Sequence, residues 1–382
     1  MNKKTILYIG GFKLPDRNSS AIRVLGIARM FNDLGYDIKV GGKIDKEITT
    51  YTDIDFWSVE HVGEQKYKQG TDIEPIRYKV KELGKENLKA IIAYNYAPIA
   101  FYKLYKYCKR EGITLIPDIT EWYLIDGKVT PTSILRVLLT NWRIAIISPR
   151  CKNIIFAVHY MANRFKKNHA LILPQVSLVQ KTKDEVGFLE LDQRIKFVYV
   201  GYPGIGFSKE RVDWCIEAFA ELSEQFDNFE YHVIGVNKET VLEYNAKLRE
   251  PIQKLGDKLK IHGRQPHEFV FEHLKNAQFN LFIRPENRVS KVGYPGKAKE
   301  AFDFGLPLFT NDTGDLALYT KDGVNGFIFD RFDKKMLRDK LEKVLSMSVD
   351  EINQLKQDCL GRHPLHPDVF REKTKTFLEN LK

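Results

Sequence analysis

The hydrophobic positions of this chain follow two patterns that alternate from one end to the other. Short, continuously apolar runs that end at glycine or proline are typical of buried parallel strands, and Thr5–Ile9 is the first of them. The segment after it places apolar residues at helical spacing behind Ser19 and Ser20, whose side chains can cap a helix. This alternation of strand and helix patterns predicts an α/β fold.

The same alternation continues and then restarts after a polar, charged stretch. Strands are expected at residues 37–40, 90–94, 114–117, 154–158, 171–174, 195–200, 231–234, 260–262 and 280–283. We therefore predict two Rossmann-like domains facing an interdomain cleft. The predicted boundaries are 1–175 for the first domain, 176–193 for the linker, 194–366 for the second domain, and 367–382 for a helix packing back on the first.

The most informative stretch runs from Gly293 to Thr310 and reads as a loop, a helix, a break and a strand. Gly293, Pro295 and Gly296 favour a loop, and good helix formers follow from Lys297 onward. A glycine-containing loop that enters a helix presents unpaired backbone N–H groups and the positive end of the helix dipole. The stretch therefore predicts an anion site. A surface loop before an ordinary helix is the alternative.

The sequence Pro-x-Lys-x-x-Glu-Ala from Pro295, followed by Gly-Leu-Pro, resembles the donor-site signature of GT-B glycosyltransferases of the retaining, GT4-like group. The resemblance implies that this region holds the diphosphate of a nucleotide sugar and that Glu300 binds the ribose. The donor-binding residues implied here are Gly293, Tyr294, Pro295, Gly296, Lys297 and Glu300. The chain departs from the family at Val292, where a second glutamate is usual.

A second candidate donor element follows the strand at 195–200. Gly204, Gly206 and Lys209 form a glycine-rich loop with a lysine, which suits a phosphate, although such a loop is often only a turn. Family members usually carry Gly-Arg here, whereas this chain has Tyr202, so Arg211 or Arg284 are candidate replacements. Lys209 is expected to offset charge on the departing diphosphate. Arg264 follows the strand that runs beside the nucleotide base in the family, or is a surface residue.

In the first domain, two segments can meet the acceptor and the transferred sugar. Gly11 ends the first strand where the family brings backbone close to the acceptor, and Arg23 can contact an anionic acceptor. Asp118 and Glu121 stand where many relatives have a histidine, and a carboxylate there can stabilise positive charge at the anomeric carbon. The alternative is a helix-capping acid beside a buried aromatic pair.

Charge is distributed unevenly along the chain. The net charge is +10, and residues 1–180 hold 28 Lys+Arg against 17 Asp+Glu, while residues 181–382 hold 32 against 33. The basic half favours an anionic partner, either a membrane surface, a phosphorylated lipid or nucleic acid; a lysine-rich solvated surface is the alternative. Residues 134–147 are strongly apolar and fit an interfacial helix or a buried one.

Composition also bears on location. Four cysteines without paired spacing favour a reduced, cytosolic chain. No apolar run reaches 18 residues, and the N-terminus lacks a signal-peptide core. We expect a cytoplasmic protein associated with the inner face of the membrane, acting in surface polysaccharide or lipid-linked glycan synthesis.

Mechanistic expectations follow from the resemblance and from what the sequence lacks. No histidines stand at metal-ligand spacing, so no metal or cofactor is expected beyond the nucleotide-sugar substrate. The resemblance implies transfer with retention through a front-face displacement. An oxidoreductase would need Gly-x-Gly-x-x-Gly after the first strand, and no nucleic-acid-binding motif is recognisable. Val292 and Tyr202 leave open a non-catalytic partner with the same fold.

Overall fold

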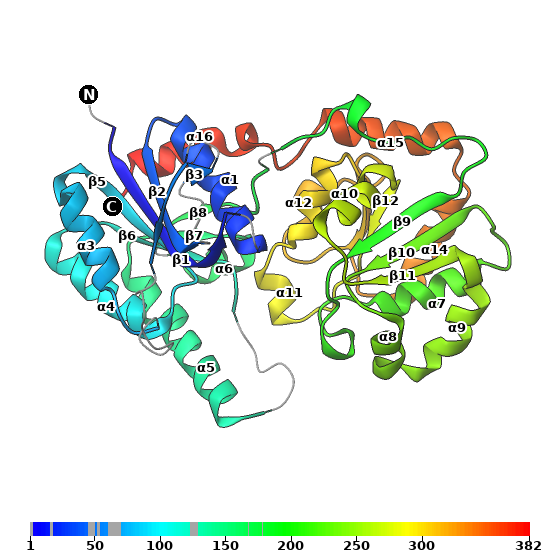
Figure 1. Ribbon diagram of the computed structural model, residues 1–382, viewed down its shortest axis with the longest axis horizontal. Coiled ribbons are helices and arrows are strands. Elements are labelled where there is room, and N and C mark those ends of the chain that lie inside the picture. Colours follow the sequence, from blue (N-terminus) through cyan, green and yellow to red (C-terminus); the bar gives the residue numbers. More distant parts are fainter. Residues whose placement is uncertain are drawn as a thin grey trace. The chain divides into compact units, whose positions relative to one another are not determined.

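The computed structural model describes residues 3–15, 18–44, 50–51, 54–59, 70–122, 129–166, 168–177 and 179–382 (Figure 1). The chain forms two compact units, and each is described by itself. Unit 1 comprises Met1–Leu178, Lys291–Tyr294 and His366–Lys382, and unit 2 comprises Val179–Ser290 and Pro295–Leu365. Most of the predicted linker, 176–193, is thus grouped with unit 2, and the C-terminal helix with unit 1.

Unit 1 is built on an eight-stranded sheet with strand order β3-β4-β2-β1-β5-β6-β7-β8. All pairs are parallel except β3 with β4. The strands are β1 (Thr5–Leu14), β2 (Asp37–Ile44), β3 (Thr50–Tyr51), β4 (Ile54–Ser58), β5 (Leu88–Tyr94), β6 (Leu115–Ile119), β7 (Asn153–Phe156) and β8 (His169–Ile172).

The helices of unit 1 connect these strands, and α16 packs on α1 and β8 (Figure 1). They are α1 (Ser19–Asp33), α3 (Glu74–Leu83), α4 (Pro98–Glu111), α5 (Pro131–Trp142), α6 (His159–Arg164) and α16 (Pro367–Glu379), with a π-helical turn η2 (Arg143–Ile147) and 3-10 turns η1 (Lys85–Asn87) and η3 (Ser148–Arg150).

Unit 2 has a six-stranded parallel sheet with strand order β11-β10-β9-β12-β13-β14. Numbered within the unit, this is the Rossmann order 3-2-1-4-5-6, in which ligands bind beyond the carboxyl ends of the strands, where the winding reverses between β9 and β12. The strands are β9 (Ile195–Val200), β10 (Phe229–Ile234), β11 (Leu259–Gly263), β12 (Phe279–Leu281), β13 (Leu308–Asn311) and β14 (Gly326–Phe329).

The remaining helices belong to unit 2, except for the end of α11. They are α7 (Val212–Leu222), α8 (Lys238–Tyr244), α9 (Arg249–Leu255), α10 (His267–Asn276), α11 (Arg288–Val292), α12 (Gly296–Asp303), α13 (Leu316–Tyr319), α14 (Lys334–Leu345) and α15 (Val349–Gly361), with 3-10 turns η4 (Lys183–Glu185), η5 (Ile205–Phe207), η6 (Ala246–Leu248) and η7 (Gly256–Lys258).

The prediction of two Rossmann-like domains is confirmed, and the differences are local. The first helix is capped by Asn18, whose side chain accepts from the Ala21 N–H at 2.9 Å, and not by the serines that follow it. The segment expected at 134–147 as a single helix changes to a π-helical turn at Arg143. Within the described residues, no helix combines the length and apolarity needed to cross a bilayer.

Candidate functional site

The loop after β9 carries the glycines expected for close approach to a phosphate. Gly201 has φ +134° and Gly204 has φ +82°, conformations that favour glycine over other residues. A Cβ at Gly204 would lie 2.5 Å from Ser208 Oγ and 2.9 Å from Lys209 N, so any side chain would displace the loop. Gly206 also has positive φ, at +59°. The glycines therefore hold a tight loop at the carboxyl edge of the sheet.

Lys297 joins this loop to the start of α12. A Cβ added at Gly201 would lie 3.3 Å from Lys297 Nζ. The same ammonium is 3.2 Å from Glu210 Oε1 and 4.2 Å from the centroid of the Tyr199 ring. Two segments that the sequence analysis identified separately, almost 100 residues apart, are thus brought together around one buried cation.

Glu210 and Tyr199 complete this cluster, and the sequence analysis missed both. The Tyr199 hydroxyl donates to Glu210 Oε2 at 3.1 Å, and the Glu210 carboxylate is buried. Burial lowers the pKa of Lys297, while Glu210 opposes the shift. A buried lysine held by one carboxylate and an aromatic face can exchange that carboxylate for a phosphate, which carries more charge.

The start of α12 has the features of an anion-binding helix N-terminus. Pro295 precedes the helix with extended backbone, and among the described residues no side chain caps the first turn. The amides of Gly296 and Lys297 therefore stand at the positive end of the helix dipole. Gly293 and Tyr294 lie just before this turn, in the segment grouped with unit 1, and the Tyr294 side chain is buried.

The candidates to offset the diphosphate charge were Lys209, Arg211 and Arg284, and the structure places them differently. Arg284 is buried near Lys297 and Glu210, its Nη1 donates to the Ser290 carbonyl at 3.2 Å, and burial lowers its pKa. Arg211 instead pairs with Asp213 and covers the Trp214 ring at 4.3 Å. The structure therefore favours Arg284 over Arg211 as the replacement for the family arginine.

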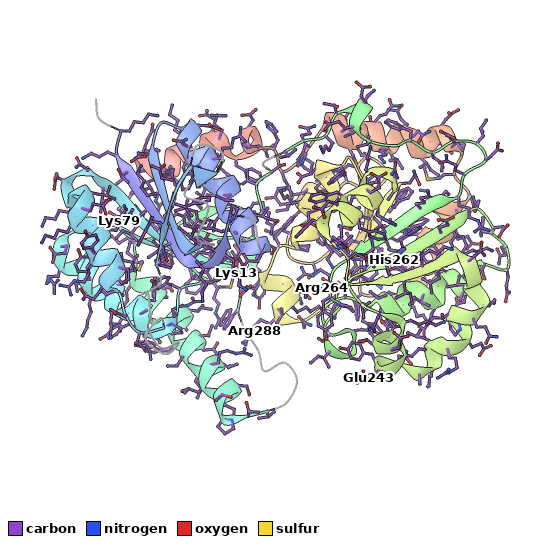
Figure 2. The ribbon with its side chains drawn as sticks, in the orientation of Figure 1. Lys13, Lys79, Glu243, His262, Arg264 and Arg288 are labelled. Carbon is purple, nitrogen blue, oxygen red and sulfur yellow. The ribbon has the colours of Figure 1, made fainter. Side chains whose placement is uncertain are left out.

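The other predicted donor residues are more peripheral. Lys209 and Arg264 are exposed, and Figure 2 shows Arg264 among the side chains near the ends of the second sheet. Tyr202 is also exposed, and its hydroxyl hydrogen bonds to that of Tyr244. Glu300 is half-buried one turn into α12, where burial raises the pKa of its carboxyl. Val292 is fully buried and offers no carboxylate.

In unit 1, Arg23 and Asp118 form a buried ion pair. Arg23 Nη1 and the Tyr8 hydroxyl both donate to Asp118 Oδ2, and Arg23 Nη2 donates to the Leu173 carbonyl at 2.9 Å. Burial alone would lower the pKa of Arg23, but Asp118 raises it, so the guanidinium keeps its charge. The two side chains are 3% and 0% exposed, which favours a structural role; direct contact with sugar or acceptor stays a prediction.

Glu121 and Gly11 lie closer to solvent. Glu121 is half-buried after β6. Burial lowers the pKa of Arg143, and the charge of Glu121 opposes that shift. Burial raises the pKa of Tyr94, and the charge of Glu121 adds to that shift. Gly11 is exposed on β1, and a Cβ there would meet no atom within 4 Å. Of the two predicted carboxylates in unit 1, Asp118 is buried and Glu121 is partly exposed; contact of Glu121 with a sugar stays a prediction.

Two groups of possible metal ligands bear on the prediction that sugar transfer needs no metal. The sequence contains the triplet Asp53-Ile54-Asp55; Asp53 lies outside the described residues, and Asp55 pairs with Lys39 on β2. In addition, the fold brings three histidines together that have no metal-ligand spacing in sequence: His232, His262 and His273.

Two Rossmann-like units, the second with a glycine-rich loop that meets a helix start at Lys297, are the architecture of the GT-B fold. Residues 190–358 match the family model described as glycosyl transferases group 1. No curated protein sequence matches the chain. The two units therefore have the GT-B fold, and residues 190–358, most of the second unit, are similar to glycosyl transferases group 1.

Solved structures support the fold over nearly the whole chain. Sucrose-phosphate synthase from Thermosynechococcus elongatus is 12% identical with a TM-score of 0.67, each chain being covered to 99%. TarM is 10% identical with a TM-score of 0.68, again with 99% of each chain covered. HepE from Anabaena, solved with UDP and glucose, is 13% identical with a TM-score of 0.64 and covers 99% of this chain and 100% of its own.

Proposed function

We propose that this protein is a retaining glycosyltransferase that moves a sugar from a nucleotide diphosphate donor to a glycan or lipid-linked acceptor without a metal. The observation that carries the proposal is the position of Lys297, at the start of α12 and against Gly201 of the second donor loop. HepE was solved with UDP-glucose, and WaaB is titled a lipopolysaccharide outer core galactosyltransferase. These neighbours favour a uridine diphosphate sugar and a surface glycan.

The residues of this chain suit the departure of a diphosphate. The bond between the anomeric carbon and the diphosphate oxygen breaks, and the acceptor hydroxyl forms the new bond on the same face. The acceptor proton passes to the departing phosphate oxygen, so no protein base is required. Lys297, Arg284 and the α12 amides would stabilise the charge that develops on the diphosphate. Glu300 would hold the ribose, and Glu121 would face the sugar.

The stereochemistry can be tested by the slow hydrolysis of the donor in the absence of acceptor. UDP-glucose, an α-linked donor, is incubated with the protein in EDTA, and the released glucose is followed by NMR before mutarotation. We expect α-glucose first and an unchanged rate in EDTA. Initial β-glucose would contradict retention, and loss of the rate in EDTA would contradict metal independence. If UDP-glucose is not cleaved, the same experiment is run with GDP-, ADP- and CMP-sugars, and no cleavage of any would favour the non-catalytic alternative.

Donor affinity should fall as the pH rises through the lowered pKa of Lys297. Burial lowers this pKa in the free protein, whereas a bound diphosphate would raise it again, so binding takes up a proton between the two values. Within that interval the affinity for UDP should fall by up to about tenfold per pH unit. Titration calorimetry at several pH values measures the slope. Lys297→Arg is the control, because arginine stays protonated and should show a flatter profile. Equal slopes would contradict the role of Lys297.

We further propose that unit 1 contacts an anionic membrane surface through α5, as expected for a cytoplasmic protein with a lipid-linked acceptor. Ile134, Leu135 and Leu138 are 41%, 56% and 61% exposed, so the alternative of a buried helix is wrong for α5 at these positions, although it holds for Ile144 and Ile147, which are buried. In Figure 1, α5 extends away from the sheet of unit 1. An apolar helix surface beside an excess of basic residues suits interfacial binding to anionic lipid.

Replacing both leucines of α5 tests the membrane contact. The Leu135→Glu/Leu138→Glu variant should lose sedimentation with vesicles that contain anionic lipid, because burial of the two side chains is replaced by charge repulsion. Leu318→Glu, at a 52% exposed leucine of α13 in unit 2, is the matched control and should sediment like the wild type. Equal sedimentation of the two variants would contradict the proposal.

A further inference from the structure

Three histidines of unit 2 come from three different elements and meet on one side of its sheet. His232 lies on β10, His262 on the neighbouring edge strand β11, and His273 on α10. One ring nitrogen of each lies within 4.8 Å of one nitrogen of each of the others. The closest approach is 3.1 Å, between His232 Nδ1 and His262 Nε2.

Hydrogen bonds at the far side of two rings determine which nitrogens carry lone pairs. His232 Nε2 lies 3.0 Å from Glu230 Oε2, and since a carboxylate only accepts, this nitrogen holds the proton and leaves Nδ1 with its lone pair. His273 Nδ1 lies 2.9 Å from the Phe269 carbonyl and must donate to it, which leaves Nε2 with a lone pair. Carboxylates and carbonyls orient metal-binding histidines in the same way.

The three rings are packed close together. The ring centroids of His262 and His273 lie 5.0 Å apart, and those of His232 and His273 lie 5.2 Å apart. A cavity of about 120 Å³ adjoins His232 and His273 and is also lined by Glu272. It leaves room for a water or a carboxylate as a fourth ligand.

We propose that His232, His262 and His273 bind a divalent transition metal ion, with zinc as the representative case. Three imidazoles with an open fourth position form a common zinc ligand set. Zn–N bonds of about 2.0–2.1 Å need nitrogens closer together than 4.8 Å, which small side-chain rotations provide. The proposed role of the metal is structural, and no step of sugar transfer is assigned to it.

The metal would hold the edge of the second sheet together. β11 is the outermost strand, paired only with β10 among the described strands, and α10 reaches both strands through the ring of His273. The loop from Gly263 to Pro266 follows His262 directly, and Gln265 Nε2 donates to the His262 carbonyl at 2.7 Å. Figure 2 labels His262 and, within this loop, Arg264. A metal at the three histidines therefore tethers the loop that carries Arg264.

The test uses the full-length chain without a histidine tag, stripped of metal by a chelator and then titrated with Co²⁺. Visible absorption of Co²⁺ reports coordination by nitrogen, and we expect it to saturate at one equivalent and to be displaced by Zn²⁺. His262→Gln should weaken binding by more than about 100-fold, and Glu230→Gln, which removes only the orienting carboxylate, by about 10-fold to 100-fold. His267→Gln, an exposed histidine on α10, is the matched control and should bind like the wild type.

Thermal unfolding gives a second readout. Zn²⁺ should raise the midpoint of the wild type and of His267→Gln in a concentration-dependent manner, but not that of His262→Gln. If His262→Gln does not fold, His273→Gln takes its place. The proposal is overturned if Co²⁺ gives no saturable absorption, or if cluster and control variants bind alike; the three rings then serve as aromatic packing only. The Co²⁺ titration uses no nucleotide sugar and does not depend on donor cleavage, so the two proposals fail separately.

Discussion

Lys297→Met should bind nucleoside diphosphate about 10-fold to 150-fold more weakly than the wild type. A hydrogen bond to a charged group contributes about 1.5–3 kcal/mol, and Lys297 is the buried ammonium at the junction of both donor loops. The loss in kcat should be larger, about 100-fold or more, because charge on the diphosphate grows as the bond to the sugar breaks. Titration calorimetry with UDP and donor turnover measure the two effects.

Two further lysines make this prediction specific. Lys335→Met, an exposed position at the start of α14, is the control and should leave binding and turnover unchanged. Lys209→Met tests the residue that the sequence favoured; because Lys209 is exposed, we expect its loss to matter less than that of Lys297. A Lys297→Met protein that binds UDP like the wild type would contradict the donor site described above.

Arg23→Leu should destabilise unit 1 by about 3–5 kcal/mol. The substitution leaves the Asp118 carboxylate buried, with the Tyr8 hydroxyl as its remaining donor, and an uncompensated buried charge has a cost of this size. The Arg23→Leu/Asp118→Leu double variant should recover part of the loss, because neither charge is then left alone. Urea unfolding, followed by hydrogen exchange of the β1 and β6 amides, measures the effect within unit 1.

The same variants decide between a structural and a direct role for this pair. If the pair is structural, Arg23→Leu lowers stability while UDP affinity, which depends on unit 2, stays unchanged. If Arg23→Leu or Asp118→Asn abolished transfer without changing stability, the prediction of acceptor contact by Arg23 and catalysis by Asp118 would be favoured instead.

The parts of the donor site that the sequence predicted are those determined by local chemistry. Gly204 adopts a positive φ, and Pro295 has extended backbone directly before α12, so each residue type indicates its own backbone conformation. The helix expected from Lys297 begins one residue earlier, at Gly296. The strand at 195–200 was predicted with its exact bounds because a continuous apolar run has few alternatives.

The parts that could not be predicted depend on pairings between distant residues. Arg23 and Asp118 are separated by 95 positions, and nothing near either residue indicates that they neutralise each other. His232 and His262 are 30 positions apart and meet only because β10 and β11 are neighbours in the sheet. Hydrophobic periodicity also could not predict whether residues 134–147 are buried or exposed, because an apolar surface can face a core or a lipid equally well.

The central claim is a nucleotide-sugar site formed by the β9 loop and α12. Its most direct test is thermal unfolding of the wild type and Glu300→Ala with UDP-, GDP-, ADP- and CMP-sugars, without added metal. A ligand that binds only the folded state raises the midpoint by mass action. We predict that one nucleotide class raises the midpoint of the wild type and shifts that of Glu300→Ala much less. No shift from any donor at millimolar concentration, or equal shifts in both proteins, would contradict the site.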